Sequence, residues 1–376
     1  MEKKYFAPSE LIINEDGSAF HLHLKPEQVA DKVILVGDPG RVETVASFFE
    51  SKECEADNRE FKSITGTYQG KRITVLSTGI GCDNIDIVMN ELDVLVNVDG
   101  TIFHLHLKPE QLADKIILVG DPSRVSLVAS HFDSRECEVE NREFKTITGM
   151  YKGKRITVMS SGIGCDNIDI VMNEIDALAN INFKTRYENE EFRQLEIVRV
   201  GTCGGLQENT PLGAHVCTVK SIGFDGLLNF YADRNKVCDL DIEQAFVLHM
   251  GWRGNQCIAH PYVVDTDKEL MERISKDDMV RGLTVAAGGF FGPQGRELRV
   301  PLADPQQNEK IKNFEYHTLR IANFEMESSA LTGLARLMGH KAVTACLVVA
   351  NRTRKEASTE YRRQIDELIV KVLDRI

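Results

Sequence analysis

The sequence predicts an α/β fold in which helices cover both faces of a central sheet. Apolar runs such as "KVILVGD" (32–38) and "LEIVRVGTCGG" (195–205) end in glycine or Gly-Asp, which is typical of buried strands that stop at a turn. Apolar residues three and four apart then indicate helices, as in "RVETVASFFE" (41–50). Alternating apolar strands and helices predict a sheet covered on both sides, with ligands bound beyond the strand ends.

The first half of the chain contains one segment twice. "FHLHLKPEQ" at 20–28 returns at 103–111, an offset of 83 residues. Other segments return at the same offset, so the copies run from Asn14 to Val96 and from Asn97 to Ala179. Removing one copy leaves 293 of the 376 residues, which suits a single α/β domain. The duplication argues against a solenoid, which needs three or more shorter repeats.

Both copies predict the same succession of elements. In the first copy, a strand at 33–37 leads to a helix at 41–50, and a hairpin follows around Tyr68-Gln69-Gly70. The second hairpin strand runs into "GIG", after which apolar spacing predicts a helix at 82–96.

The second half continues the alternation after a charged linker at 183–194. The predicted elements are strands at 195–205 and 215–224, a strand with a glycine-rich loop at 282–300, a helix at 323–339, a strand at 342–352 and a terminal helix at 359–376.

Composition excludes several classes of protein. A formal net charge of −12 argues against non-specific nucleic-acid binding, which needs a basic surface. The nine cysteines contain no C-x-x-C pair, which indicates reduced thiols and a cytoplasmic protein. We find no signal peptide and no apolar run long enough to span a membrane.

Three segments carry candidate anion-binding residues. Gly37 to Arg41, and its twin Gly120 to Arg124, place a glycine at a strand end and an arginine at a helix start, where exposed N–H groups and a guanidinium can hold phosphate. A plain surface turn is an equally good interpretation of either segment alone. Arg199 lies within a buried strand and must be paired, in a site or in an internal salt bridge, and Thr202 ends that strand.

Other candidates are weaker when taken singly. Gln294 and Arg296, on a glycine-proline loop near Phe290, can present donors and an acceptor to a flat heterocycle, or they form a polar loop tip. Glu327 can accept from sugar hydroxyls or simply complement a helix dipole. Arg142, like its first-copy twin in "NREF", is on its own most simply a solvated hairpin residue.

Together and in this order, the motifs resemble the nucleoside phosphorylase family, most closely its uridine phosphorylases. The resemblance rests on Phe-His, G-D-P-x-R, "NREF", "STGIG", "RVGTCG", "GPQGR", "FEMES" and "ANRT", and covers nearly the whole chain once one copy is removed. It implies a three-layer α/β/α nucleoside phosphorylase-like fold with a central mixed sheet. It also implies a homo-oligomer built from dimers.

The resemblance assigns roles to individual residues. It implies phosphate binding by Gly120, Arg124, Arg199 and Thr202, with Arg142 reaching the phosphate from a neighbouring subunit. It implies ribose binding by Met326 and Glu327, with His104 from the neighbour, and base binding by Phe290, Gln294, Arg296 and Arg352. The first-copy equivalents are Gly37, Arg41, Arg59 and His21.

The implied reaction is the reversible phosphorolysis of uridine to uracil and ribose 1-phosphate. Inorganic phosphate is then a co-substrate, and no metal or organic cofactor is expected. Purine-specific relatives carry a Ser-Asp pair where this chain has Ala350-Asn351, which favours a pyrimidine. The alternatives are a purine nucleoside phosphorylase, a nucleosidase, or a nucleoside-binding protein inactivated by the duplication.

The family carries one copy of the repeated segment, so one copy here is spare. We expect residues 97–376 to form the catalytic domain, because the second copy runs directly into the remaining sequence, and residues 1–96 to form an extra partial fold. "STGIG" at 77–81 favours the first copy, since the later copy has Ser161 in place of threonine. We expect the spare copy to dock at the dimer interface or to swap with a neighbour's copy, which would supply His21 and Arg59. The alternative is that it blocks assembly and leaves a weakened or inactive protein.

Overall fold

The computed structural model describes residues 14, 16–19, 21–58, 61–78, 101–183, 187–254, 257–354, 356–358 and 361–376. The chain divides into two compact units, Met1–Lys108 with Asn180–Glu190 and Pro109–Ala179 with Glu191–Ile376. The expected boundary between residues 96 and 97 lies outside the described residues, and the division into 1–96 and 97–376 stays a prediction.

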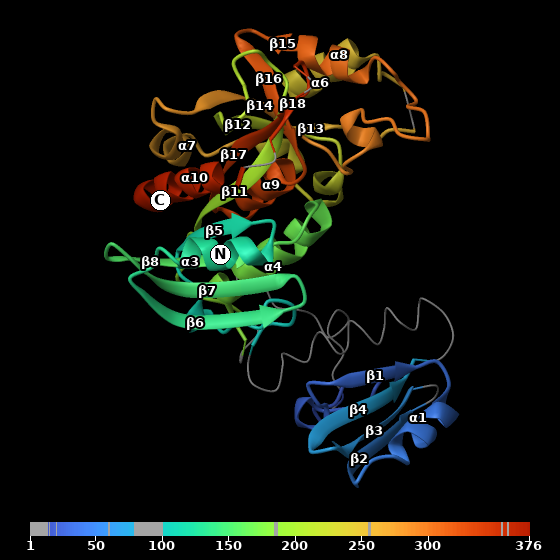
Figure 1. The fold of residues 1–376 in the computed structure, drawn as a ribbon. Coiled ribbons are helices and arrows are strands. Elements are labelled where there is room, and N and C mark those ends of the chain that lie inside the picture. The colour runs from blue at the N-terminus through green and yellow to red at the C-terminus, as the bar shows by residue number, and fades with distance from the viewer. Residues whose placement is uncertain are drawn as a thin grey trace. The chain divides into compact units, whose positions relative to one another are not determined.

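The first unit contains a four-stranded sheet in the order β1-β4-β3-β2, in which only β1 and β4 are parallel (Figure 1). Its repeat elements are β1 (Val33–Val36), α1 (Pro39–Ala46), β2 (Ser51–Asn58), β3 (Phe61–Tyr68) and β4 (Lys71–Ser77), with a 3-10 turn at Pro26–Gln28; β9 (Ile181–Asn182) and β10 (Tyr187–Glu188) form a separate ribbon. Helix α1 begins after Asp38, whose carboxylate accepts from the Gly40 N–H at 2.8 Å.

In the described part of the second unit, twelve strands form one mixed sheet (Figure 1). Ten lie in the order β15-β16-β14-β12-β17-β11-β5-β8-β7-β6, while β13 pairs with β12 and β18 with β17. The strands are β5 (Lys115–Val119), β6 (Ser134–Asn141), β7 (Phe144–Tyr151), β8 (Lys154–Ser160), β11 (Glu196–Gly205), β12 (His215–Gly223), β13 (Tyr262–Asp265), β14 (Val280–Ala286), β15 (Glu315–Tyr316), β16 (Leu319–Glu325), β17 (Lys341–Asn351) and β18 (Glu356–Ala357).

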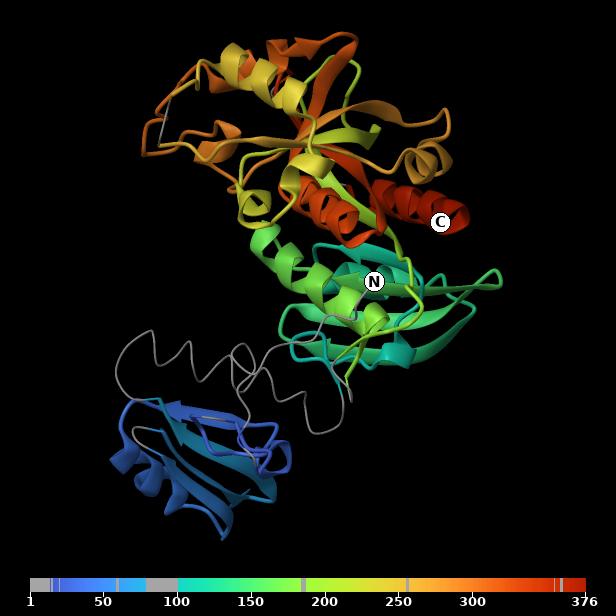
Figure 2. The same ribbon diagram turned by 180° about the vertical axis from the view of Figure 1, so that it is seen from behind.

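Helices cover this sheet on both faces (Figure 2). They are α3 (Pro122–Ala129), α4 (Cys165–Asn180), α5 (Arg234–Val237), α6 (Leu240–Met250), α7 (Lys268–Ser275), α8 (Gln307–Asn313), α9 (Ser328–Met338) and α10 (Tyr361–Arg375), with 3-10 turns at Pro109–Gln111, Leu227–Phe230 and Gly292–Gln294. Alternate side chains of β17 serve the two faces: Val343 and Ala345 share a core with α7 and α10, whereas Cys346 and Val348 belong to another. The predicted three-layer α/β/α fold with a central mixed sheet is confirmed.

Strand β11, which carries Arg199, lies between β17 and a strand from the second copy of the repeat. Strand β5 runs parallel to β11, with Ile117 opposite Val198 and Leu118 opposite Arg199. The predicted helix at 82–96 of the first copy lies outside the described residues, while the equivalent segment of the second copy forms α4.

The helix predicted at 323–339 begins later than expected. Residues 323–325 belong to β16, and α9 begins only at Ser328. Phe324 is buried and pairs with Val285 of β14 and Gly204 of β11, so sheet pairing takes precedence over the local helical pattern.

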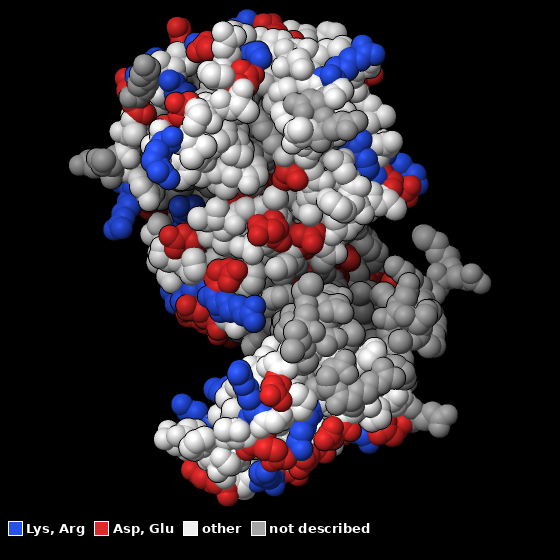
Figure 3. Space-filling view, turned by 90° about the vertical axis from the view of Figure 1, so that its right-hand side faces the viewer, with Lys and Arg blue, Asp and Glu red and all other residues white. Residues whose placement is uncertain are grey.

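The surface carries charges of both signs. On the face in Figure 3, Lys and Arg side chains are interspersed with Asp and Glu over both units. Among the described helices, none has the length and apolar content needed to cross a membrane.

Candidate active site

The site is built where β11 and β16 meet at their carboxyl ends. These strands are antiparallel there, with Gly204 opposite Phe324 and Gly205 opposite Asn323. Glu325, the last residue of β16, and Glu327, two residues further on, therefore lie beside β11 and its Arg199.

Arg199 is buried and paired with two carboxylates. Its side chain is 6% exposed, its Nη1 lies 3.2 Å from a Glu325 oxygen, and its Nη2 donates to Glu327. Gly201 makes room for the guanidinium, because a Cβ at this position would lie 2.3 Å from Arg199 Nη1. The prediction that Arg199 must be paired is confirmed, and its partners come from the far end of the chain.

The two carboxylates have different surroundings. Glu325 accepts from the backbone N–H groups of Glu327 and Ser328 at 2.9 and 3.0 Å, so it caps the start of α9. Glu327 instead accepts at 2.8 Å from the N–H of Gly164, in the loop that follows β8. The second copy of the repeat therefore contacts Glu327 directly.

Burial and charge oppose each other in this cluster. Burial alone would lower the pKa of Arg199, but the Glu327 and Glu325 carboxylates outweigh it and raise that pKa. Burial raises the pKa of Glu325, with Arg199 acting against it. Arg199 is therefore held as a cation in a nearly dry environment, where its interaction with an anion is strong.

A second guanidinium, Arg124 of α3, lies close to the first. Its Nη1 donates to the Val200 carbonyl at 3.4 Å. Burial, and then the positive charge of Arg199, lower the pKa of Arg124. No carboxylate lies within salt-bridge distance of Arg124 in the described ranges. Arg199 is already paired with two carboxylates, whereas the neighbouring Arg124 has none of its own, and this favours an anion bound at Arg124 beside Arg199.

Glycines shape the loops around this pair of arginines. Gly120 follows β5, and a Cβ there would lie 3.5 Å from the Gly162 carbonyl oxygen, so the two loops touch. Gly164 has a φ of +104°, a backbone conformation that residues with a side chain rarely adopt, and its N–H donates to Glu327. The "GIG" motif is visible in the sequence, but no role for it could be predicted from the sequence alone.

The predicted base-binding residues form a second, linked cluster. Arg296 Nη1 donates to Gln294 Oε1 at 2.8 Å, and Arg352 Nη2 donates to the same oxygen at 3.2 Å. The Arg352 N–H donates to the Gly205 carbonyl at 2.9 Å, which ties this cluster to the end of β11. The structure therefore brings Gln294, Arg296 and Arg352 together.

Within the part of the chain that the structure describes, neither guanidinium of this cluster forms an ion pair. Gln294 is 4% exposed, and its oxygen is the shared acceptor of both guanidiniums. Burial, then the nearby Arg352, lower the pKa of Arg296 to about 10, so it is charged at neutral pH. Arg352 Nε is buried and has no hydrogen-bond partner among the described residues. An oxygen-rich planar ligand would satisfy these donors.

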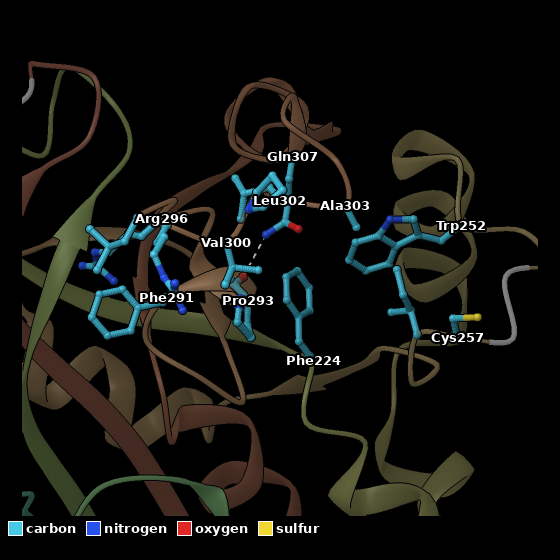
Figure 4. Close-up of a pocket in the computed structure, with 15 residues that line it drawn as sticks. Phe224, Trp252, Cys257, Phe291, Pro293, Arg296, Val300, Leu302, Ala303 and Gln307 are labelled. Atoms are coloured by element: carbon cyan, nitrogen blue, oxygen red, sulfur yellow. Dashed lines mark hydrogen bonds between the residues drawn. The ribbon is translucent and has the colours of Figure 1, made fainter.

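Phe290 lies at the rim of the cluster. Its ring is half-exposed, and the Arg296 guanidinium carbon lies 3.6 Å from the ring centroid. A cavity of about 620 Å³ opens beside Arg296 and Phe291 (Figure 4). Its other walls include Phe224, Trp252, Ile258, Leu298, Val300 and Leu302. These residues could not be predicted from the sequence, because no motif connects them to Gln294.

The Asn351 side chain is not free to transfer a proton to a base. Its Nδ2 donates to the carbonyls of Thr210 and Gln207 at 2.8 and 3.3 Å, and its Oδ1 accepts from the Arg354 N–H. All its hydrogen-bonding groups are thus engaged by the backbone.

The remaining predicted residues lie around or apart from these clusters. Thr202 is on β11, partly exposed, and Met326 lies between the two glutamates. Arg142 is exposed in the turn between β6 and β7, with a φ of 55°.

His104 and the first-copy equivalents belong to the other unit. His104 contacts Phe103, and His21 lies 6.1 Å from the Phe61 ring centroid. Gly37 and Arg41 are exposed at the start of α1, and Arg59 lies outside the described residues. The roles of all these residues stay predictions.

A family model described as the phosphorylase superfamily matches residues 31–104 and 114–376. The chain belongs to this superfamily. The two matched segments begin in different copies of the repeat, so this superfamily member carries part of its fold twice.

Known relatives act on nucleosides. The chain is 27% identical to a uridine phosphorylase of Thermococcus kodakarensis over 69% of its own length and 80% of the relative's. It is 24% identical to a DeoD-type purine nucleoside phosphorylase of Bacillus velezensis, over 69% and 92%. A Trypanosoma brucei nucleoside phosphorylase with uridine phosphorylase activity matches in structure with a TM-score of 0.66 and 28% identity, over 74% of this chain and 98% of that one.

Proposed function

We propose that the protein is a uridine phosphorylase, which converts uridine and inorganic phosphate reversibly to uracil and ribose 1-phosphate. The observation that carries the proposal is the Gln294 amide, held by Arg296 and Arg352 at the end of the strand that carries the buried Arg199–Glu327 pair. The names of the Thermococcus and Trypanosoma relatives support a uridine substrate.

Phosphate would bind at Arg124 and Arg199, with Gly120 and Thr202 at the adjoining strand ends. Two guanidiniums favour a doubly charged anion, and the low dielectric around Arg199 strengthens the attraction. The bound phosphate is the nucleophile that attacks the anomeric carbon of the sugar.

Ribose would lie against Glu327 and Met326. A carboxylate accepts hydrogen bonds from sugar hydroxyls, and Gly164 together with Arg199 fixes the Glu327 carboxylate. As the glycosidic bond lengthens, positive charge develops on the sugar, and both this carboxylate and the phosphate dianion stabilise it.

Uracil would bind between Phe290 and the Gln294 cluster. Negative charge develops on the pyrimidine oxygens as the base leaves, and Arg296 and Arg352 would donate to them. A uracil anion needs no protonated ring nitrogen, in agreement with an Asn351 side chain engaged by the backbone.

A purine nucleoside phosphorylase is the second candidate, because the Bacillus relative carries that name at similar identity. Incubating the purified chain with uridine, inosine and thymidine, each with and without phosphate, separates the two. The proposal requires uracil release that depends on phosphate. Hypoxanthine release in preference to uracil would support the purine enzyme instead, and phosphate-independent release would support a nucleosidase.

We further propose a homo-oligomer in which Arg142 and His104 of one subunit reach the phosphate and ribose of its neighbour. The exposed position of Arg142 in a hairpin turn is compatible with such a contact. Comparing Arg142→Ala with Arg59→Ala by phosphorolysis rate tests which copy contributes. Negligible losses in both variants would defeat the idea that either arginine serves a site.

A further inference from the structure

The two repeats have the same internal structure. In the first, the Thr74 hydroxyl lies 2.6 Å from that of Thr65 and accepts from the Ala30 N–H at 2.8 Å. The equivalent distances in the second repeat, around Thr157, are both 2.8 Å. A bulge also recurs at the same place, between residues 52 and 54 and between residues 135 and 137. The first repeat thus keeps the fold of the second.

The β1 side of the first repeat and the equivalent β5 side of the second differ sharply in exposure. Ile34 and Leu35 of β1 are 40% and 39% exposed, while their equivalents Ile117 and Leu118 of β5 are fully buried. Among the described strands, β1 pairs only with β4. Tyr68 follows the same pattern, at 39% exposure against 6% for Tyr151.

The structure shows what covers the β5 side of the second repeat. Strand β11 pairs along β5, and apolar side chains of α10 share a core with Ile117, Val128 and Tyr151. The Tyr151 hydroxyl also donates to Asp374 at 2.8 Å. We call this complementary surface, formed by β11 and α10, the β11–α10 face. Ile34, Leu35 and Tyr68 retain the residue types that fit it.

Two contacts favour the second repeat on that face. His131 lies 2.8 Å from Asp366, and Lys152 pairs with Asp374 at 2.7 Å. The first repeat has Phe48 and Gln69 at the equivalent positions, so it lacks the side chains for both polar contacts but keeps the apolar residues. The second repeat is therefore the preferred occupant on its own chain, and the first is left with 68% of Phe48 exposed.

We infer that the exposed face of the first repeat is a docking surface for the β11–α10 face of a second copy of this chain, where it replaces that copy's second repeat. Each exchange breaks one interface and forms a nearly identical one, which is the condition for low-cost domain swapping. Docking on a second copy also leaves the donor's own β5–β11 pairing intact. The donor would supply Gly37 and Arg41 to the partner's site in place of Gly120 and Arg124.

Substitutions in the full-length chain test the docking itself. Ile117→Asp with Leu118→Asp places buried carboxylates against β11 and releases the second repeat. We expect this double variant to keep a cooperative thermal transition, because the first repeat replaces the second. Adding Ile34→Asp and Leu35→Asp should abolish that transition. If the double and quadruple variants unfold alike, the inference is overturned.

Complementation tests whether docking occurs between chains. One chain carries Arg41→Ala, Ile117→Asp and Leu118→Asp; the other carries Arg124→Ala and Arg199→Ala. Neither chain alone has a complete phosphate site. The first repeat of the second chain still carries Arg41, and docking on the first chain would place it in the site that holds Arg199. Refolding them together should restore roughly a tenth of the native rate or more, since the partners are nearly equivalent.

Matched controls make each outcome decisive. Ile34→Asp and Leu35→Asp in the second chain should remove the restored activity. A folded double variant without complementation would place the docking within one chain and overturn the exchange between copies. The complementation arm rests on the proposed function, whereas the unfolding arm does not. The native chain's own phosphorolysis rate, measured first, therefore separates the two failures.

Discussion

Arg199 and Glu327 form a buried ion pair that joins strand β11 to the residue before α9. The pair links a candidate phosphate ligand to a candidate ribose ligand, so each side chain holds the other in position. Glu325 completes the cluster and caps α9, which makes the arrangement part of the fold as well as of the site.

The stability of this cluster depends on which member is removed. Arg199→Met leaves two buried carboxylates without their cation, and we expect it to lower the free energy of unfolding by about 3–5 kcal/mol. Glu327→Gln should cost clearly less, because Glu325 still pairs with Arg199 and the amide oxygen can still accept from Gly164. Urea denaturation of both variants measures the difference; equal losses would contradict this account of the cluster.

Gly201 controls the position of the Arg199 guanidinium. A methyl group there would lie 2.3 Å from Nη1, so Gly201→Ala must displace the guanidinium. We expect the KM for phosphate to rise by roughly 10-fold or more, as for a misplaced binding group. Gly288→Ala is the control, since its Cβ would make an ordinary 3.5 Å contact with Asp225. Steady-state kinetics with varied phosphate should separate the two variants.

How much of the site can be predicted from the sequence depends on how far apart its residues lie along the chain. The need to pair Arg199 follows from its apolar neighbours, but Glu327 lies 128 residues further on, and only the antiparallel contact of β11 with β16 brings it near. Strand β2, "SKECEADN", escaped prediction because its side chains are mostly exposed and its alternation depends on only two small residues, Cys54 and Ala56. The end of α9 was predicted correctly, since Gly339 adopts a φ of +83°.

Gln294 should decide the preference for the base. Gln294→Leu removes the shared acceptor of Arg296 and Arg352 and the amide that would contact uracil. We expect kcat/KM for uridine to fall by roughly 100-fold or more, in line with the loss of a preorganised polar group. The Phe290 ring stays in place as a platform, so any weak activity on inosine should change less. A uniform fall for both substrates would argue against base recognition by Gln294.

Asn351→Asp should destabilise the protein in a pH-dependent manner. A carboxylate there would face the carbonyl oxygens of Thr210 and Gln207, which raises its folded-state pKa above the ordinary value. Because the folded-state pKa is raised, the loss of unfolding free energy is small near pH 4. It grows as pH rises through that pKa, to about 1–3 kcal/mol. Thermal unfolding from pH 4 to 8 checks this; a loss that shrinks with rising pH would contradict it.

The central claim is that Arg124 of the second repeat and Arg199 of β11 bind one phosphate ion. The most direct test is the KM for phosphate in Arg124→Ala, with Arg135→Ala as a control, because Arg135 is an exposed arginine of the same repeat that lies next to Glu138. We predict that KM rises by roughly 100-fold in Arg124→Ala, as for loss of a charge-assisted contact in a buried site, and stays unchanged in the control. An unchanged KM in Arg124→Ala, in a chain that releases uracil from uridine, would contradict the claim.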